Sequence, residues 1–350
     1  AKKAFFVCNY IQRTYGSNVM LLTATPFTNN PVEIYSVCSL VGWNQMRDMG
    51  IENLYNFMET FILQSLEYVN SYDGTIKMDF VVKAFNNRLI LQKLIFNNIL
   101  YKTGEEAGVK RPCKINLPRT TYTDESTGQM LRLPKEKQIP TYLQMNEMQE
   151  MNQQQINMLA RSGMNVAERM KNVMRALAGS LDNALSPYIY NKVIPEDPVE
   201  FVDKSPKIKY VCECIQSVKK HHEDKGEPVS GQVIYANRGK DYFPLIKRYL
   251  EDVIGYKRAV KYQRGKVDEV EIIMSGISQS QKEKIKDAFL DGVCKVIIGT
   301  ATIREGIDLQ KRGSVIYNMY PDWNPTDVRQ LEGRVWRQGN EFGYVRVVMP

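Results

Sequence analysis

Residues 295–309 read KVIIGTATIREGIDL, a short apolar run followed by a loop of hydroxyl, glycine and charged residues. The run 295–299 is predicted to be a buried parallel strand, because such strands are nearly continuous apolar stretches. Similar strands are expected in the second half of the chain at 232–235, 271–274, 314–317 and 344–348. Short apolar strands that alternate with helices indicate a parallel sheet covered on both faces. The predicted fold class is therefore α/β.

The segments between these strands carry helical patterns. Helices are expected over 207–220 and 243–250. Ser278 and Gln281 have the spacing of a capping box, which should open a helix that reaches Phe289. This alternation predicts one complete α/β domain from about residue 201 to residue 350.

The first 200 residues show a different pattern. The run 19–22 (VMLL) is predicted to be a buried strand, with helices before it and after it, and this α/β unit is too small to form a sheet alone. Several helices are expected over 43–101, an irregular proline-containing segment over 102–140, a helical segment over 141–184 and a linker over 186–206. In the helical segment Met145, Met148 and Met151 are expected to pack in a core. The predicted domains are 1–42, 43–200 and 201–350.

Composition limits the possible functions. The formal charge of +8 and the pI of about 9.0 fit a partner rich in phosphate, although a basic surface alone is a weak signal. Six scattered cysteines and two histidines give no zinc spacing, so no metal site is predicted and reduced thiols inside the cell are expected. No apolar run approaches the ~18 residues of a membrane helix, and no export signal is expected. The absence of an initial Met suggests a trimmed chain.

Ligands bind at the carboxyl ends of parallel strands, so the loops there are the first candidates for a site. In the loop after residue 299, the hydroxyls of Thr300 and Thr302 could hold a phosphate together with backbone N–H groups. Gly306 allows close backbone approach, and Asp308 could accept a hydrogen bond from a ribose hydroxyl. The alternative is an ordinary loop with a helix-capping threonine.

The segment 330–339 (QLEGRVWRQG) is predicted to continue a helix that the turn 320–326 positions. Gln330, Arg334 and Arg337 would then share one helical face. Two neighbouring guanidinium groups repel each other unless an anion lies between them, and a triphosphate is a natural candidate. Gly333 costs ~1 kcal/mol in a helix, which indicates close approach to its backbone. The alternative is an ion-pair surface that involves Glu332 or Glu341.

The order of these loops, together with Thr23-Ala24-Thr25-Pro26, resembles motifs III, V and VI of superfamily-two helicases. The pattern Gln-x-x-Gly-Arg-x-x-Arg is complete at 330–337. Residues 21–36 and 320–339 are most similar to the Swi/Snf branch of that superfamily. The motif at 306–308 and Gly333 follow the general helicase pattern instead, and Asn340 replaces the final Gln of the Swi/Snf motif. Duplex translocation and strand separation therefore both stay open.

The resemblance implies a RecA-like second motor lobe, preceded by a helical insertion and a remnant of the first lobe. It implies that Arg334 and Arg337 reach the γ-phosphate of ATP, with Gln330 beside them. The other implied roles are nucleic-acid contact for Thr300, Asn237, Arg238, Ser275 and Gly276, nucleotide contact for Gly306, Asp308 and Gly333, and coupling between lobes for Thr23 and Thr25.

ATP hydrolysis also requires a Gly-x-x-x-x-Gly-Lys-Ser/Thr loop and an acidic motif for Mg²⁺, and neither occurs in these 350 residues. ATP and Mg²⁺ are therefore expected to bind mainly to an N-terminal lobe of the same protein, and this chain alone should be inactive. DNA is the expected partner, with RNA as the alternative, in the cytoplasm or nucleoid. A basic cluster at 257–266 is predicted to add phosphate contacts. A non-catalytic binding module is the alternative function.

Overall fold

The computed structural model describes residues 2–16, 18–23, 31–70, 76–104, 106–123, 130–304, 306–320, 322 and 324–350. The chain divides into two compact units, residues 1–108 and 109–350. This division falls inside the segment 43–200, and the three-domain assignment stays a prediction.

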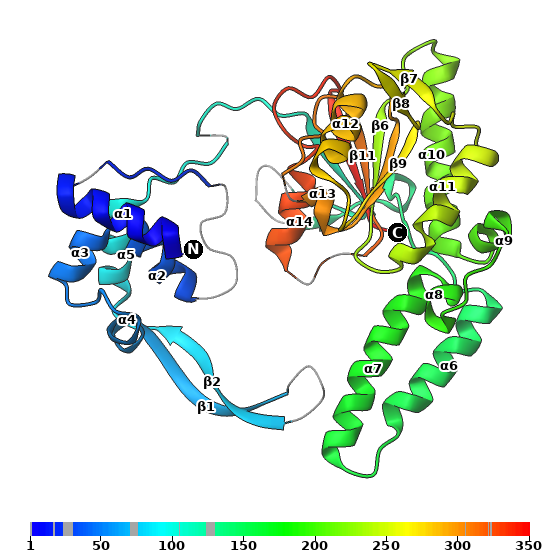
Figure 1. Ribbon diagram of the computed structural model, residues 1–350. Helices are drawn as coiled ribbons and strands as arrows, with labels where there is room; N and C mark the ends of the chain where they lie inside the picture. Colours follow the sequence, from blue (N-terminus) through cyan, green and yellow to red (C-terminus); the bar gives the residue numbers. More distant parts are fainter. Residues whose placement is uncertain are drawn as a thin grey trace. The chain divides into compact units, whose positions relative to one another are not determined.

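The first unit combines helices with one long hairpin (Figure 1). Its helices are α1 (Lys2–Tyr15), α2 (Pro31–Val41), α3 (Trp43–Asp48), α4 (Leu54–Phe61) and α5 (Arg88–Asn98). A small core holds Cys38, Met46, Phe57, Phe61 and Leu94. The hairpin consists of β1 (Ile62–Asn70) and β2 (Ile76–Phe85), which pair antiparallel. The expectation of helices alone over 43–101 is therefore wrong, because residues 62–70 and 76–85 alternate apolar and polar side chains with the period of a strand.

The predicted strand at 19–22 is also wrong. These residues form no strand, and the side chains of Met20 and Leu22 are 81% and 87% exposed. A parallel strand is stable only when neighbours supply its hydrogen bonds. No described strand pairs with this segment, so its apolar composition does not produce a strand.

The second unit is built on a six-stranded sheet with the order β3-β12-β11-β6-β10-β9. These strands are Cys113–Leu117, Tyr344–Val348, Gly313–Asn318, Gly231–Tyr235, Val296–Gly299 and Val270–Ile273, in the same order. Every neighbouring pair is parallel. The five predicted strands and the α/β class are confirmed. The sixth strand, β3, lies in the segment 102–140 that was predicted to be irregular, and it extends the edge of the sheet beside β12.

Helices cover both faces of this sheet (Figure 1). They include α9 (Pro198–Asp203), α10 (Pro206–Asp224), α11 (Phe243–Asp252), α12 (Gln279–Leu290), α13 (Ala301–Arg304) and α14 (Pro325–Glu332). Ile298 contributes to the core beneath α10 and α11, and its neighbour Ile297 contributes to the core beneath α12. This alternation buries the strands on both faces, as expected for a parallel sheet. The N-cap of the predicted capping box is confirmed, since Ser278 Oγ accepts the N–H of Gln281.

Short elements complete the second unit. They are β4 (Thr121–Thr123), β5 (Met130–Arg132), β7 (Val260–Tyr262), β8 (Gly265–Val267) and the 3₁₀ turns Lys135–Lys137 and Lys240–Tyr242. None of the helices in the described part of the chain combines the length and apolarity that a membrane crossing requires.

A helical arm, formed by α6 (Glu147–Arg161) and α7 (Val166–Leu185), extends away from the sheet, and the short helix α8 (Pro187–Asn191) follows α7 at the base of the arm (Figure 1). The helical prediction over 141–184 is confirmed for most of its length. Met148 packs against the main core. The expectation of core packing is wrong for Met145 and Met151, which are 50% and 64% exposed.

Candidate functional site

The candidate site begins where the central strands end. β6, β10 and β11 are parallel neighbours, so their carboxyl ends lie at one edge of the sheet. Thr300 directly follows β10, and Asn237 lies two residues after the end of β6. The fold therefore brings together two residues that are 63 positions apart in the sequence, as the strand pattern predicts.

Asn237 connects three loops at this edge. Its Oδ1 accepts the N–H of Ala301 at 2.9 Å, and its Nδ2 donates to Tyr235 Oη at 2.8 Å. Nδ2 also donates to Asp322 Oδ1 at 2.5 Å. The amide is thus engaged on both sides within the protein, and it fixes the position of the loop that carries Thr300.

Asp322 lies at the centre of a second set of contacts. It accepts hydrogen bonds from Tyr235 Oη at 2.5 Å and from Arg304 Nη1 at 3.0 Å. Arg304 also pairs with Asp327 at 2.9 Å. The side chains of Arg304 and Asp322 are only 14% and 13% exposed. Burial, assisted by the hydrogen bond to Asp322, raises the pKa of Tyr235. We call Tyr235, Asn237, Arg304, Asp322 and Asp327 the Asp322 cluster.

Sequence reasoning assigned Asp322 to a turn and missed Tyr235 and Arg304. A usable signal was present, because Tyr235 ends a predicted strand and Arg304 and Asp322 follow the neighbouring strands. Charged residues of opposite sign at the carboxyl ends of adjacent parallel strands are expected to meet.

Two further predicted residues lie near this edge. The N–H of Thr300 donates to Ile273 O at 3.3 Å, and its hydroxyl lies 3.4 Å from that of Thr302. The guanidinium of Arg238 binds Asp182 of α7 at 2.6 Å and lies over the ring of Tyr320. Arg238 is therefore held by groups of the protein at the base of the helical arm.

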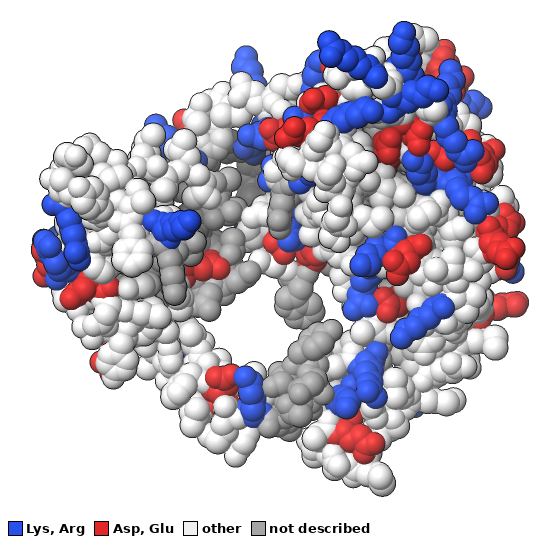
Figure 2. All heavy atoms as spheres, viewed as in Figure 1, with Lys and Arg blue, Asp and Glu red and all other residues white. Residues whose placement is uncertain are grey.

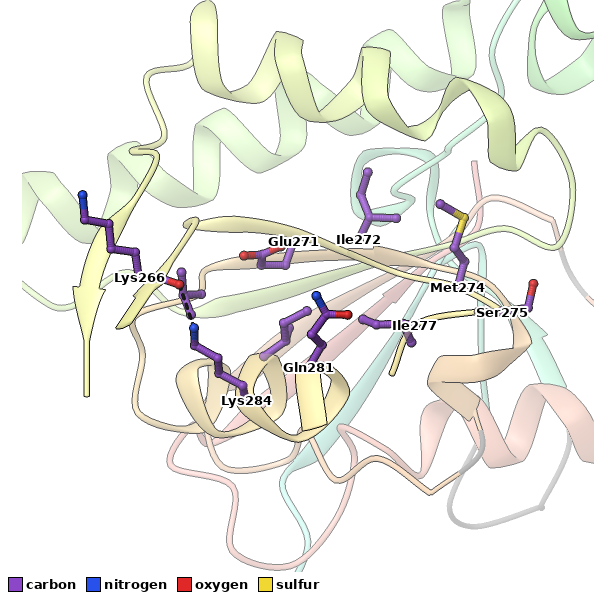
Figure 3. A pocket seen from close by; sticks show the side chains of 11 residues that line it. Lys266, Glu271, Ile272, Met274, Ser275, Ile277, Gln281 and Lys284 are labelled. Atoms are coloured by element: carbon purple, nitrogen blue, oxygen red, sulfur yellow. Dashed lines mark hydrogen bonds between the residues drawn. The ribbon is translucent and has the colours of Figure 1, made fainter. Parts of the chain in front are cut away.

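Ser275 and Gly276 line a cavity of about 520 Å³ between β8, β9 and α12 (Figure 3). Gly276 has a φ of +95°, a conformation that favours glycine. Lys266 and Lys284 line the same cavity, and Lys284 Nζ donates to Lys266 O at 3.0 Å. The cavity thus combines the hydroxyl of Ser275 with the ammonium group of Lys284 and the carboxylate of Glu271.

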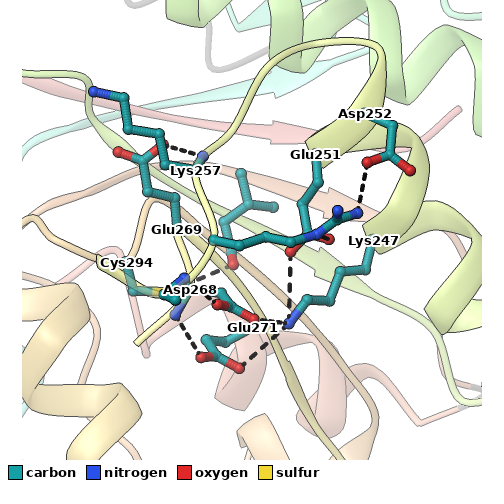
Figure 4. A network of polar contacts seen from close by, with 11 residues as sticks. Lys247, Glu251, Asp252, Lys257, Asp268, Glu269, Glu271 and Cys294 are labelled. Carbon is teal, nitrogen blue, oxygen red and sulfur yellow. Dashed lines mark hydrogen bonds and ion pairs between the residues drawn. The ribbon is translucent and has the colours of Figure 1, made fainter. Parts of the chain in front are cut away.

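The basic cluster at 257–266 is partly neutralised. Figure 2 shows basic side chains gathered over the β7–β8 region, with acidic ones among them. Arg258 pairs with Glu251 and Asp252, both at 2.6 Å, beside the pair of Lys247 with Asp268 (Figure 4). Lys261, Arg264 and Lys266 are exposed. These three residues carry the positive surface of the cluster.

The predicted helix over 330–339 is wrong beyond its first turn. α14 ends at Glu332, and Gly333 forms its cap with a φ of −64°. Arg334 and Arg337 therefore lie in a loop, residues 333–339, which we call the arginine loop. The chain turns here because Val335 is buried in the core and the Trp336 indole donates to Pro112 O, just before β3. These tertiary contacts override helical propensity.

The two arginines nevertheless meet at one anion, the carboxylate of Asp308. Asp308 Oδ1 lies 2.5 Å from Arg337 Nη1 and 3.7 Å from Arg334 Nη1. The N–H of Leu309 donates to Arg334 O at 3.0 Å, which holds the two loops together. The exposed fractions of Asp308 and Arg337 are 49% and 50%, against 24% for Arg334. We call these three charged residues the Asp308 cluster.

The sequence also allowed ion pairs of these arginines with Glu332 or Glu341, but both glutamates bind other residues. Glu332 binds Lys114 at 2.8 Å, and Glu341 binds Arg312 at 2.8 Å. Trp336 connects the arginine loop to the start of β3, since its Nε1 donates to Pro112 O at 2.7 Å. Arg111 and Lys114 lie over its ring, 4.9 and 4.8 Å from the centroid.

The remaining predicted residues are distributed as follows. Gly306 has a φ of +72°, and a Cβ there would meet no atom within 4 Å. Gln330 is half-buried on α14. Thr23 is exposed in the first unit, and Thr25 lies outside the described residues. Among the described residues, no group of three or more His, Cys, Asp or Glu side chains is arranged to hold a metal ion.

Comparisons with known proteins found one family model and several solved structures that are similar to parts of the chain. Residues 207–339 match the family model of the helicase conserved C-terminal domain. No curated protein matches the chain. The C-terminal part of the Fun30 ATPase domain is similar over 69% of this chain and 85% of that chain, with 12% identity and a TM-score of 0.46.

Two structures from Sulfolobus solfataricus are also similar. The similarity to the SWI2/SNF2 ATPase C-terminal domain extends over 58% of this chain and 74% of that chain, with 14% identity and a TM-score of 0.38. The similarity to the SWI2/SNF2 ATPase core domain extends over 75% of this chain and 45% of that chain, with 15% identity and a TM-score of 0.45. The family match agrees with the predicted resemblance to helicases over residues 207–339, which make up less than half of the chain.

Proposed function

We propose that this chain supplies the arginine-bearing lobe of an ATP-driven nucleic-acid translocase or helicase of the Swi/Snf type. The observation that carries the proposal is the Asp308 cluster, in which two guanidinium groups share one half-exposed carboxylate. Arginine pairs bind phosphate oxygens in this way, because guanidinium donates several N–H bonds and keeps its proton. The conserved helicase domain over 207–339 includes all three residues and supports the assignment.

Charge balance explains how the cluster would act on a nucleotide. The terminal phosphoryl group of ATP carries more negative charge than a carboxylate and would replace Asp308 between the arginines. Asp308 would then be released toward the nucleotide ribose, which is the role that the sequence resemblance implies.

The arginines would stabilise the negative charge that develops on the departing phosphoryl group. Gly306 would leave the backbone beside Asp308 open to the nucleotide, since no neighbouring atom occupies the space where its Cβ would lie. The described residues do not fit a Mg²⁺ site, so we assign Mg²⁺ no step on this chain. The sequence contains no phosphate-binding loop, and we therefore propose that the chain alone does not hydrolyse ATP.

The carboxyl edge of the sheet would contact the nucleic-acid backbone. The Thr300 hydroxyl and the cavity at Ser275 and Gly276 offer donors for phosphate oxygens. Asn237 would act by fixing the Thr300 loop, because its own amide is engaged within the Asp322 cluster. DNA is the proposed track, and the exposed basic residues of the β7–β8 hairpin would add contacts that weaken as salt rises.

Titration of the 350-residue chain with inorganic tripolyphosphate tests the proposal. We expect binding to wild type, and binding several-fold tighter to Asp308→Asn, because the competing carboxylate is gone. The double variant Arg334→Ala/Arg337→Ala should lose most of the affinity. A matched control, Arg132→Ala/Arg161→Ala, removes two exposed arginines elsewhere and should bind normally. Equal affinity of the Arg334/Arg337 and control variants would disprove the assignment of the anion site.

A further inference from the structure

The helical arm has an unusual distribution of polar and apolar side chains. Helices of globular proteins normally turn their apolar stripe toward the partner helix. On α7, the side facing α6 carries Asn172, Ala176, Gly179 and Asn183. A Cβ at Gly179 would come within 3.0 Å of Tyr190 and 3.6 Å of Ile156, so the two helices of the arm approach closely there.

Amide groups make much of this internal contact. Asn183, 1% exposed, donates to Gln149 O at 2.8 Å, while Gln149 Nε2 donates to Asn183 O at 2.7 Å. Asn152 Nδ2 donates to Asn183 Oδ1 at 3.0 Å. Such a satisfied network fixes the register of the two helices. The contact between the two helices therefore relies on amides. Of the larger apolar residues of α7, only Leu185, in the main core, is buried, and five others are exposed.

Those apolar residues lie on the outer side of α7. Five of them recur at steps of three, four and seven residues and are between 36% and 68% exposed: Val166, Val173, Met174, Leu177 and Leu181. At 1.5 Å per residue, this outer stripe extends about 22 Å along the helix. Contiguous exposed apolar surface of this kind marks sites of protein–protein interaction.

Charge indicates which partner fits the outer stripe. Lys171 and Arg175 are one turn apart and exposed, and at 3.6 residues per turn both lie beyond the Met174 side of the stripe. In the described part of the chain, neither of them forms an ion pair with a carboxylate, whereas the acidic residue Asp182 on the same helix is already bound to Arg238. A narrow stripe at helical spacing suits an amphipathic helix, and the two free cations favour acidic residues at its border.

We propose that the outer stripe of α7 binds an acidic amphipathic helix of a partner protein. The helix would lie along α7 with its apolar face on Leu177 and Leu181, while its carboxylates pair with Lys171 and Arg175. Single-stranded nucleic acid fits this surface less well, because the stripe contains no aromatic side chain on which a base could stack. The proposal concerns a surface separate from the Asp308 cluster and does not depend on ATP chemistry.

The test uses the 350-residue chain and a designed 20-residue helical peptide, with leucine along one face and glutamate on both borders. Fluorescence anisotropy of the labelled peptide measures its affinity. We expect Leu177→Asp/Leu181→Asp to weaken binding by roughly tenfold or more, as for central residues of an interface. Lys171→Glu/Arg175→Glu should weaken it as well, and a peptide with lysine in place of glutamate should bind poorly. The control Met151→Asp/Met158→Asp, which alters exposed methionines on α6, should bind like wild type.

Several results would overturn the proposal. Equal binding of the glutamate and lysine peptides would exclude recognition of an acidic partner. Binding that survives both the Leu177/Leu181 and Lys171/Arg175 changes would place the peptide elsewhere. Self-association of wild type that Leu181→Asp abolishes would make a second copy of this chain the occupant. Loss of oligonucleotide binding without loss of peptide binding in these variants would make nucleic acid the occupant.

Discussion

The Asp322 cluster and the Asp308 cluster use the same chemistry in different surroundings. In the first, Arg304 and Asp322 are 14% and 13% exposed, and the carboxylate accepts bonds from three side chains. In the second, Asp308 and Arg337 are half-exposed and the carboxylate serves two arginines. A buried ion pair cannot lose one partner without a large cost, whereas an exposed pair exchanges easily with solvent or ligand. From this difference we infer that the Asp322 cluster has a structural role and that the Asp308 cluster is available to an anionic ligand.

The largest expected effect on stability belongs to the buried cluster. Asp322→Ala should lower the free energy of unfolding by about 3 kcal/mol, because it leaves Arg304 partly uncompensated and removes the acceptor of Tyr235 and Asn237. Urea denaturation followed by circular dichroism measures the change. Asp203→Ala removes an exposed ion pair with Lys209 and should change the stability by under ~0.5 kcal/mol. If the free energy of unfolding falls equally in both variants, burial does not make the Asp322 contacts more stabilising than an exposed ion pair.

An intermediate effect is expected at Trp336, which anchors the arginine loop. Trp336→Ala should cost about 2 kcal/mol, since it removes the bond to Pro112 O and the contacts of the ring with Arg111 and Lys114. Trp336→Phe keeps a ring beneath the two cations and should cost about half as much. The affinity for tripolyphosphate should fall in the same order, because the ring positions the loop of Arg334 and Arg337. If the affinity of Trp336→Ala for tripolyphosphate equals that of wild type, Trp336 does not position the arginine loop.

The smallest effect is expected at Asp308 itself. Asp308→Ala should change the free energy of unfolding by less than ~1 kcal/mol, because its ion pairs are half-exposed. The same denaturation experiment measures it beside Asp322→Ala. A loss as large as that of Asp322→Ala would mean that Asp308 is structural and that the two clusters do not differ in kind.

The sequence predicted the parts of the fold that rest on local pattern. Five strands of the main sheet are continuous apolar runs, and the cap at Ser278 depends on a residue three positions away. β3 was not predicted because its sequence, CKINL, is short and only half-buried at the edge of the sheet. Its position depends on pairing with β12, more than 200 residues further along the chain. The β1–β2 hairpin was missed because its alternation was interpreted as helical.

In the candidate site, too, local pattern predicted some features, and contacts between distant residues determine the others. The resemblance placed Arg334, Arg337 and Asp308 among the functional residues, and spacing brought the two arginines together. Spacing alone suggested a helix, however, and the loop forms because Trp336 binds Pro112, 224 positions away. The pairing of both arginines with Asp308 likewise depends on how two loops meet in space, which no local pattern contains.

The central claim is that Arg337 stabilises the departing phosphoryl group. Its most direct test is the single-turnover rate of ATP hydrolysis by a protein that joins this chain to a lobe with a phosphate-binding loop. Arg337→Ala should lower that rate by about 10³-fold or more, as for other arginines that contact a transferred phosphoryl group. Arg132→Ala should hydrolyse ATP at the wild-type rate. A wild-type rate in Arg337→Ala, with ATP bound normally, would contradict the account.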